Sequence, residues 1–388
     1  MDLTDPEITF DSEGICSYCR YFEKYVKPKW YPGTTKAKNE LEKIIKDIKE
    51  KQINQEYDAI IGLSGGVDSS FLAYWAVKYA GLRLLAVHVD AGWNSELAVQ
   101  NIEKIVKNLG IELYTHVVDW EAIRDVQLAF FKAGVANQDT PQDHSFFSVL
   151  YDFAVKNNIK YVLNGSNIAT ESILPKAWGH DAMDADQIKD ICVKFKAQRF
   201  KKFPLVSFFK YHFYFPYIKK MQIIRPLNYI EYKKYEAIEI LERELGWKYY
   251  GGKHYESRFT KFFQGYWLPE KYGYDKRKAH LSSIILSGEI TREEALKELE
   301  TPAYDSNSLK GDIEFVSKKL EVKPEEFMEL MQQKNTSYLQ FRHNTFKKKI
   351  CLFGLYILKN LTLPFAVAKN PRKMYKKIAL ISQFTKKQ

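Results

Sequence analysis

Residues 64–70 combine glycine, serine and aspartate in an order that suits the binding of a polyphosphate. They lie between an apolar run at 57–63 and a helical pattern at 69–79, so the turn presents backbone N–H groups and a helix N-terminus to an anion. Glycine permits backbone angles and a close approach that a side chain would block. Aspartate can hold the Mg²⁺ that accompanies a triphosphate. The pattern predicts a site for ATP and Mg²⁺ formed by Ser64, Gly65, Gly66, Asp68, Ser69 and Ser70.

This loop has no lysine at the Walker position, which argues against ordinary transfer of a γ-phosphate. Its Ser-Gly-Gly-Val-Asp-Ser order resembles the loop of the ATP pyrophosphatase (PP-loop) superfamily, which includes asparagine synthetases, GMP synthetases and tRNA thiolation enzymes. The resemblance implies that AMP is transferred to a substrate oxygen and then displaced by a nucleophile. The alternative interpretation is a glycine-rich turn that only connects a strand to a helix.

Short apolar runs alternate with amphipathic segments through the first half of the chain. Strands are expected at 57–63, 84–89, 111–118 and 161–164, and helices at 69–79, 95–109, 120–133 and 144–157. This alternation predicts an α/β fold with a doubly wound parallel sheet of the PP-loop ATP pyrophosphatase type.

Three polar or glycine positions follow the predicted strands and are candidates for nucleotide binding. Asp90 closes the second strand, and Gly165 and Glu171 follow the fourth. Ligands of such sheets bind at the carboxyl ends of the strands. Each acid could equally be an ordinary helix cap or turn residue.

After residue 165 the alternation stops, and helices and aromatic-rich loops are expected up to residue 290, with helices at 229–245, 291–300 and 309–333. The predicted organisation is an N-terminal cysteine-containing extension (1–56), the nucleotide-binding domain (57–185), a mostly helical substrate region (186–344) and a basic amphipathic tail (345–388).

Residues 246–283 contain charged, glycine and aromatic residues at a density that neither a core helix nor a solvated loop requires. One interpretation is an interdomain segment with aromatic anchors. The other is a polar pocket that faces the phosphate loop, with cations to hold a nucleotide-sugar or a leaving phosphate.

Several motifs together resemble one family within that superfamily. They are the loop, DSEGICSYC at 11–19, GGKHYESRFTKFFQGY at 251–266 and DKRKAHLSS at 275–283. They are similar to the N-acetyl sugar amidotransferases of bacterial surface-polysaccharide and sialic-acid-like (pseudaminic-acid-type) sugar pathways, over about residues 7–300. The resemblance implies that ATP adenylates the acetamido oxygen of a sugar, which is expected to be nucleotide-linked, and that ammonia then displaces AMP to give an acetamidino group. Ammonia is expected from a separate glutaminase complex similar to that of histidine biosynthesis.

This chemistry requires stabilisation of charge at the phosphates and at the tetrahedral centre. The expected cations are Lys253, Arg258, Lys276 and Arg277. His254 and His280 are candidates for proton transfer, and Glu256 for orientation or a metal contact. Pairing of these groups with one another, without a direct role, is an equally open interpretation.

Cys16 and Cys19 have the spacing of zinc ligands but make only half of a four-ligand site. Cys192 could supply a third thiolate. The competing interpretation is a pair of free thiols beside an aromatic loop.

The net charge of +11 is concentrated in the tail, since residues 345–388 hold eleven Lys or Arg and no acid. The other residues hold 48 basic and 48 acidic side chains, and such a neutral body argues against nucleic acid as a partner. A second acid-free stretch at 191–230 carries nine Lys or Arg among aromatics. It could bind a diphosphate or anionic lipid, or it could be an insert whose lysine stems cover apolar surface.

An apolar stretch at 350–368 is interrupted by Lys359 and Pro364 and predicts an interfacial or packed helix, not a membrane span. With few cysteines and a polar start to the chain, the expected location is the cytoplasm, with peripheral contact to the inner face of the membrane.

Two other functions remain open at this point. One is a tRNA-modifying PP-loop enzyme of thiolase or lysidine type, which requires a basic body and often paired cysteines. The other is a nucleotide-binding scaffold without turnover.

Overall fold

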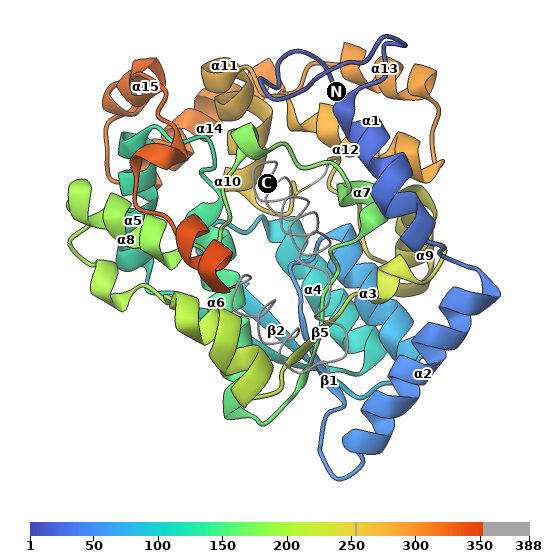
Figure 1. Ribbon diagram of the computed structural model, residues 1–388. Helices are drawn as coiled ribbons and strands as arrows, with labels where there is room; N and C mark the ends of the chain where they lie inside the picture. The colour runs from blue at the N-terminus through green and yellow to red at the C-terminus, as the bar shows by residue number, and fades with distance from the viewer. Residues whose placement is uncertain (253, 352–388) are drawn as a thin grey trace, which may run out of the picture.

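Five parallel strands form the centre of the computed structural model, which describes residues 1–252 and 254–351 (Figure 1). Their order is β3-β2-β1-β4-β5. The chain therefore winds outward from β1 in both directions, and the carboxyl ends of β1 and β4 border a topological switch point. This confirms the predicted doubly wound sheet. The strands are β1 Ala59–Gly62, β2 Leu84–Asp90, β3 Glu112–Val117, β4 Tyr161–Leu163 and β5 Gln222–Ile224.

Helices connect the strands and make up most of the chain beyond β5. They are α1 Ser17–Tyr21, α2 Thr35–Lys51, α3 Val67–Lys78, α4 Glu96–Leu109, α5 Trp120–Ala133, α6 Thr140–Lys156, α7 Ile168–Glu171, α8 Ala185–Lys194, α9 Lys234–Leu245, α10 Arg258–Phe262, α11 Leu268–Tyr272, α12 Lys276–Ser287, α13 Arg292–Glu300, α14 Ser306–Lys319 and α15 Pro324–Gln332. A capping box begins α13, in which the side chains of Thr291 and Glu294 each accept a hydrogen bond from the other residue's backbone N–H.

Neighbouring residues of β1, β2 and β4 point into two different cores, as the pleat requires. On β1, Ile60 belongs to the core shared with α5 and α6, whereas Ile61 belongs to the core shared with α2, α3 and α4. Both residues are fully buried. These three strands are thus covered on both faces, which explains why they are continuous apolar runs, whereas the edge strand β3 is largely exposed.

The structure differs from the sequence-based expectation at four elements. Helix α9 begins at Lys234, not at residue 229. Strand β5 pairs with β4 in a region expected to hold only helices and loops. Helix α6 begins at Thr140, not at residue 144. The helix expected at 309–333 is divided into α14 and α15, because Pro324 favours the first turn of a new helix.

Aromatic residues of the C-terminal helices form one core with α5. The ring of Phe131 lies 4.7 Å from that of Trp267 and 5.0 Å from that of Phe327, both in edge-to-face contact. Phe259 packs against Trp93 at 4.9 Å, and these residues are essentially inaccessible to solvent. Aromatic packing of this kind contributes beyond the burial of area, so the C-terminal region is firmly attached to the sheet.

Several cations of the acid-free stretch at 191–230 are paired with acids from elsewhere in the chain. Lys202 lies 3.2 Å from Asp119, and Lys210 lies 2.6 Å from Asp152. Arg199 pairs with Glu121. Surface contacts of this type leave less free positive charge than the sequence suggests.

The tail prediction falls largely on residues 352–388, which lie outside the described residues. Within the described part of the chain, no helix has the length and apolarity needed to cross a membrane.

Truncation of the aromatic core should destabilise the fold. We expect Phe131→Ala to lower the free energy of unfolding by about 3–5 kcal/mol, because a fully buried ring is replaced by a cavity. Phe209→Ala is the matched control, since that ring is 59% exposed and should change stability by about 0.5 kcal/mol or less. Urea denaturation of both variants measures the difference. Equal effects would contradict this account of the core.

Candidate active site

The loop at 64–70 connects β1 to α3 at the switch point and depends on two glycines. Gly65 has a φ of +81°, and a Cβ there would lie 2.7 Å from the carbonyl oxygen of Ala98. A Cβ on Gly66 would lie 2.7 Å from Glu256 Oε1. At Gly65 the left-handed backbone and the Ala98 carbonyl exclude a side chain, whereas a side chain at Gly66 would require the Glu256 carboxylate to move. Ser64 Oγ accepts a hydrogen bond from the Gly66 N–H (3.2 Å), which holds the turn closed.

Residues 247–257 bind this loop from the C-terminal half of the chain. The indole N–H of Trp247 donates to the Gly65 carbonyl (3.1 Å), and the Val67 N–H donates to the hydroxyl of Tyr250 (3.0 Å). Burial, together with the charge of Glu256, raises the pKa of Tyr250 well above its usual value, so the phenol stays protonated. The Glu256 carbonyl also accepts the Ser95 N–H at the start of α4 (2.9 Å).

A cavity of 620 Å³ opens between the loop and these residues. It is large enough for a nucleotide and part of a second ligand. Ten of the sequence-predicted site residues line it: Ser64, Gly66, Asp68, Ser69, Gly165, Glu171, His254, Glu256, Lys276 and His280.

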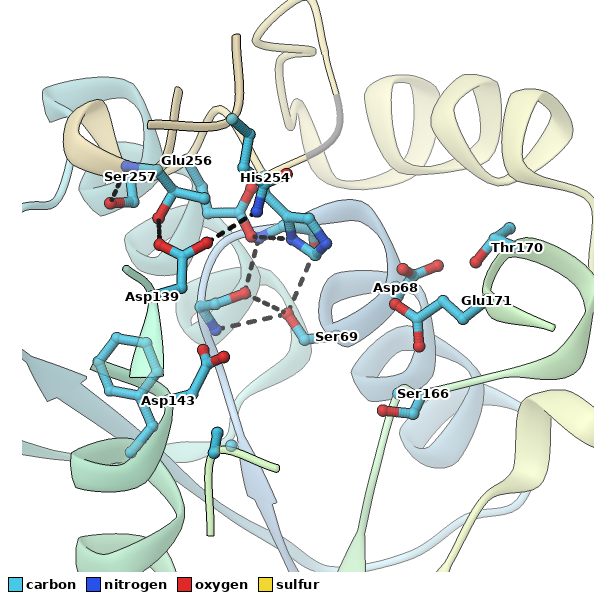
Figure 2. A pocket seen from close by; sticks show the side chains of 18 of the residues that line it. Asp68, Ser69, Asp139, Asp143, Ser166, Thr170, Glu171, His254, Glu256 and Ser257 are labelled. Atoms are coloured by element: carbon cyan, nitrogen blue, oxygen red, sulfur yellow. Dashed lines mark hydrogen bonds and ion pairs between the residues drawn. The ribbon is translucent and has the colours of Figure 1, made fainter. Parts of the chain in front are cut away.

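Asp68 lies on one side of the cavity with Ser166, Thr170 and Glu171 (Figure 2). Tyr232 donates a hydrogen bond to Asp68 Oδ1, and Asn167 Nδ2 lies 3.3 Å from the same oxygen. These donors favour the ionised carboxylate. Carboxylates beside a phosphate loop fit Mg²⁺, which takes one or two protein carboxylates and completes its shell with phosphate oxygens and water. Asp68 and Glu171 are the residues that would hold it, and it would neutralise phosphate charge there.

The opposite side of the cavity holds two acids that the sequence reading missed, Asp139 and Asp143 (Figure 2). Asp139 accepts hydrogen bonds from Thr260 Oγ1 (3.0 Å) and Gln264 Nε2 (2.8 Å). Burial raises the pKa of Asp143 to about 7, with a further contribution from the charge of Asp139. The spacing of four residues could have identified them as neighbours on a helix face, but the predicted helix began at residue 144.

Two histidines of residues 246–283, His254 and His280, line the same cavity. His254 Nδ1 is 3.6 Å from Glu256 Oε1, and the rings of His254 and His280 are 5.9 Å apart. Lys276, in the first turn of α12, also lines the cavity. These groups can contribute charge and protons to a bound ligand.

Several predicted site residues do not line the cavity. Gly65 packs against α4, and Ser70 is fully buried in α3. Asp90 accepts hydrogen bonds from the Gly92 N–H (2.7 Å) and from Asn94 Nδ2 (3.0 Å), so it shapes the turn after β2 and orients Asn94, which does line the cavity.

Two of the expected cations have structural partners in place of a ligand. Arg258 lies 2.6 Å from Asp312 and 3.8 Å above the ring of Phe315. Arg277 forms a two-pronged contact with Asp275 and donates to the Thr301 carbonyl (2.7 Å). The interpretation that these cations pair within the protein therefore fits both. Lys253 lies outside the described residues.

The structure does not support a zinc site. Cys16 Sγ and Cys19 Sγ lie 3.4 Å apart, whereas Cys192 is buried in the core with α5. In residues 1–252 and 254–351, no three His, Cys, Asp or Glu side chains are grouped so that they could bind a metal ion. The thiols are free, in agreement with the competing interpretation.

Two family models match the two halves of this site. A model described as NAD synthase matches residues 38–201, which include the loop and both acid groups. A model described as LPS biosynthesis protein WbpG-like, C-terminal domain, matches residues 256–352, which begin at Glu256. Together these matches support a WbpG-like C-terminal region that follows a nucleotide-binding half of the PP-loop ATP pyrophosphatase type.

The individual proteins that the chain resembles have low sequence identity or match only part of its length. The chain is 32% identical to a glutamine-hydrolysing GMP synthase polypeptide of Archaeoglobus fulgidus over 131 residues, which are 32% of this chain and 39% of that protein. An uncharacterised protein of Methanocaldococcus jannaschii is 21% identical over 76% of this chain and 88% of its own. The solved structure of NMN synthetase from Francisella tularensis has 18% identity and a TM-score of 0.33, over 67% of this chain and 95% of that one.

The fit of the loop against α4 gives a direct prediction. Gly65→Ala should weaken binding of MgATP at least about tenfold, because a left-handed backbone costs about 1–2 kcal/mol for alanine and the new methyl group meets the Ala98 carbonyl. Gly110→Ala is the matched control, with a φ of +61° and open space around the added methyl group. Isothermal titration with MgATP measures both. Unchanged affinity in Gly65→Ala would contradict the proposed role of the loop.

Proposed function

We propose that this chain is an ATP-dependent amidotransferase acting on an N-acetylated sugar. It adenylates the carbonyl oxygen of the acetamido group, releases pyrophosphate, and then lets ammonia displace AMP to form an acetamidino group. The sugar is nucleotide-linked, and the product enters bacterial surface-polysaccharide biosynthesis. The carrying observation is that the phosphate loop and the 250–280 region line one cavity.

The arrangement of groups supports adenylation. The loop and the serine hydroxyls of Ser64 and Ser69 line the cavity, and Asp68 and Glu171, which line it too, would hold the Mg²⁺ of a bound triphosphate. Lys276 adds positive charge to the lining of the same cavity. Fixed charges of this kind stabilise the phosphates and the developing oxyanion without costly reorganisation.

The second half of the reaction requires a nucleophile and a place for its proton. Ammonia from a separate glutaminase complex, resembling that of histidine biosynthesis, would meet the acid and histidine groups opposite the loop. Asp143 lines that part of the cavity. Peripheral contact with the inner face of the membrane, through residues 345–388, is part of the same proposal.

Substrate-dependent release of AMP tests the proposal against its rivals. The chain is mixed with MgATP, an ammonium salt and a panel of N-acetylated nucleotide-sugars, and AMP is measured by chromatography. AMP that forms only with tRNA would favour the tRNA-modifying alternative. Absence of AMP under every condition would favour a nucleotide-binding scaffold.

Asp68 should be essential for this turnover. We expect Asp68→Ala to lower sugar-dependent AMP release by at least about 100-fold, because Mg²⁺ would lose a carboxylate ligand beside the phosphates. Asp47→Ala is the control, since that acid pairs with Lys51 on the exposed face of α2 and should leave the rate unchanged. Turnover that survives in Asp68→Ala would remove its metal role.

A further inference from the structure

Asp139 and Asp143 occupy adjacent turns of the start of α6, and the two carboxyl groups differ in their partners. Asp139 is held by Thr260, Gln264 and, at 3.4 Å, Gln142. For Asp143, no hydrogen bond or ion pair of the side chain is present among the described residues, and its half-buried carboxyl group faces the cavity (Figure 2). A polar group enclosed without a partner is costly unless a ligand or a proton satisfies it.

Two acidic and two basic side chains act on the charge of Asp143. Asp139, on the same helix, and Glu171, on α7, repel its negative charge, whereas Lys276 on α12 and His254 attract it. Burial is the largest influence and favours the neutral acid, so the pKa of Asp143 rises to about 7. A carboxyl group with these surroundings can both accept and release a proton near neutral pH.

We propose that Asp143 is the catalytic base that receives the ammonia nucleophile and removes its proton. This inference rests on the proposed function. It adds a base for the ammonia step, which neither the loop at 64–70 nor residues 246–283 supply. It places the nucleophile on the side of the cavity opposite Asp68, so ammonia and pyrophosphate need not share space.

The proton balance of the step is simple. The lone pair of ammonia forms the new C–N bond with the adenylated carbon, and the nitrogen becomes positively charged. One of its protons passes to the Asp143 carboxylate. The C–O bond to AMP then breaks, AMP leaves with that electron pair, and the amidine keeps the remaining N–H protons.

Asp143→Asn separates this role from adenylation. Sugar-dependent exchange of labelled pyrophosphate into ATP reports adenylation and should stay within about threefold of the original chain. AMP release with ammonium should fall about 100-fold at pH 8. Asp152→Asn is the matched control, because it makes the same change on the same helix at a residue paired with Lys210 outside the cavity. It should match the original chain in both assays.

The pH dependence gives a readout that a merely structural role would not change. The rate of the original chain is divided by the rate of Asp143→Asn at each pH. This ratio is independent of the fraction of ammonia that is protonated, because that fraction affects both rates equally. This ratio should be about tenfold lower at pH 6 than at pH 8, because a base with a pKa of about 7 is mostly protonated at pH 6. A ratio that does not change with pH, or an equal loss of exchange and AMP release, would overturn the inference.

A second measurement needs no substrate. The Asp143 carboxyl group holds its proton up to about pH 7 in the folded chain but only up to about pH 4 when unfolded. Its contribution to stability is therefore lost as pH rises from 4 to 7. The melting temperature of Asp143→Asn should rise relative to the original chain over that range.

The two measurements distinguish the two proposals. If the original chain shows no exchange or AMP release with any N-acetylated sugar, the proposed function fails. The inference about Asp143 then fails too if the difference in melting temperature is constant with pH. A difference that grows across the range supports Asp143 as a proton acceptor in this cavity for another ammonia-type nucleophile.

Discussion

The contact between residues 247–257 and the phosphate loop is the constraint on which the rest of the site depends. Trp247 and Tyr250 satisfy a carbonyl and an N–H of the loop backbone, 182 and 183 residues away in sequence. Loss of either partner would leave a buried backbone group without a hydrogen bond, at a cost of about 1–3 kcal/mol. The nucleotide-binding sheet and the C-terminal helices therefore share one cavity wall. We expect the loop and residues 247–257 to fold cooperatively.

That wall explains the unusual composition of the segment. Its first part, up to Ser257, faces the cavity and the loop with hydroxyl, imidazole and carboxylate groups. The following turn carries Phe259, Phe262 and Phe263 into the core beneath. Polar groups of the run line the cavity and its phenylalanines lie in the core, whereas the binding of a nucleotide-sugar by this run stays a proposal. Arg258, at the junction, is turned outward onto Asp312.

Asp68 and Asp143 line the same cavity, but their surroundings favour different protonation states. Asp68 accepts hydrogen bonds from Tyr232 and Asn167, which favour its charge. Asp143 is desolvated beside another acid, which favours its proton. Two acids in such different surroundings can divide the tasks of metal binding and proton transfer. The two groups lie on opposite sides of the cavity (Figure 2), which makes the division possible.

The sequence by itself determined the doubly wound sheet and the loop at 64–70, because periodicity and glycine spacing are local properties. The composition of residues 246–283 and their resemblance to a family singled out His254, Glu256 and His280, which line the cavity. It could not reveal β5, a three-residue strand that only its pairing with β4 defines. It also missed Asp143, since a carboxylate becomes a candidate base only through the burial and charges that tertiary packing supplies. Asp90 and Arg277 have side chains that suit a binding site, but in the folded chain they interact with Gly92 and Asp275.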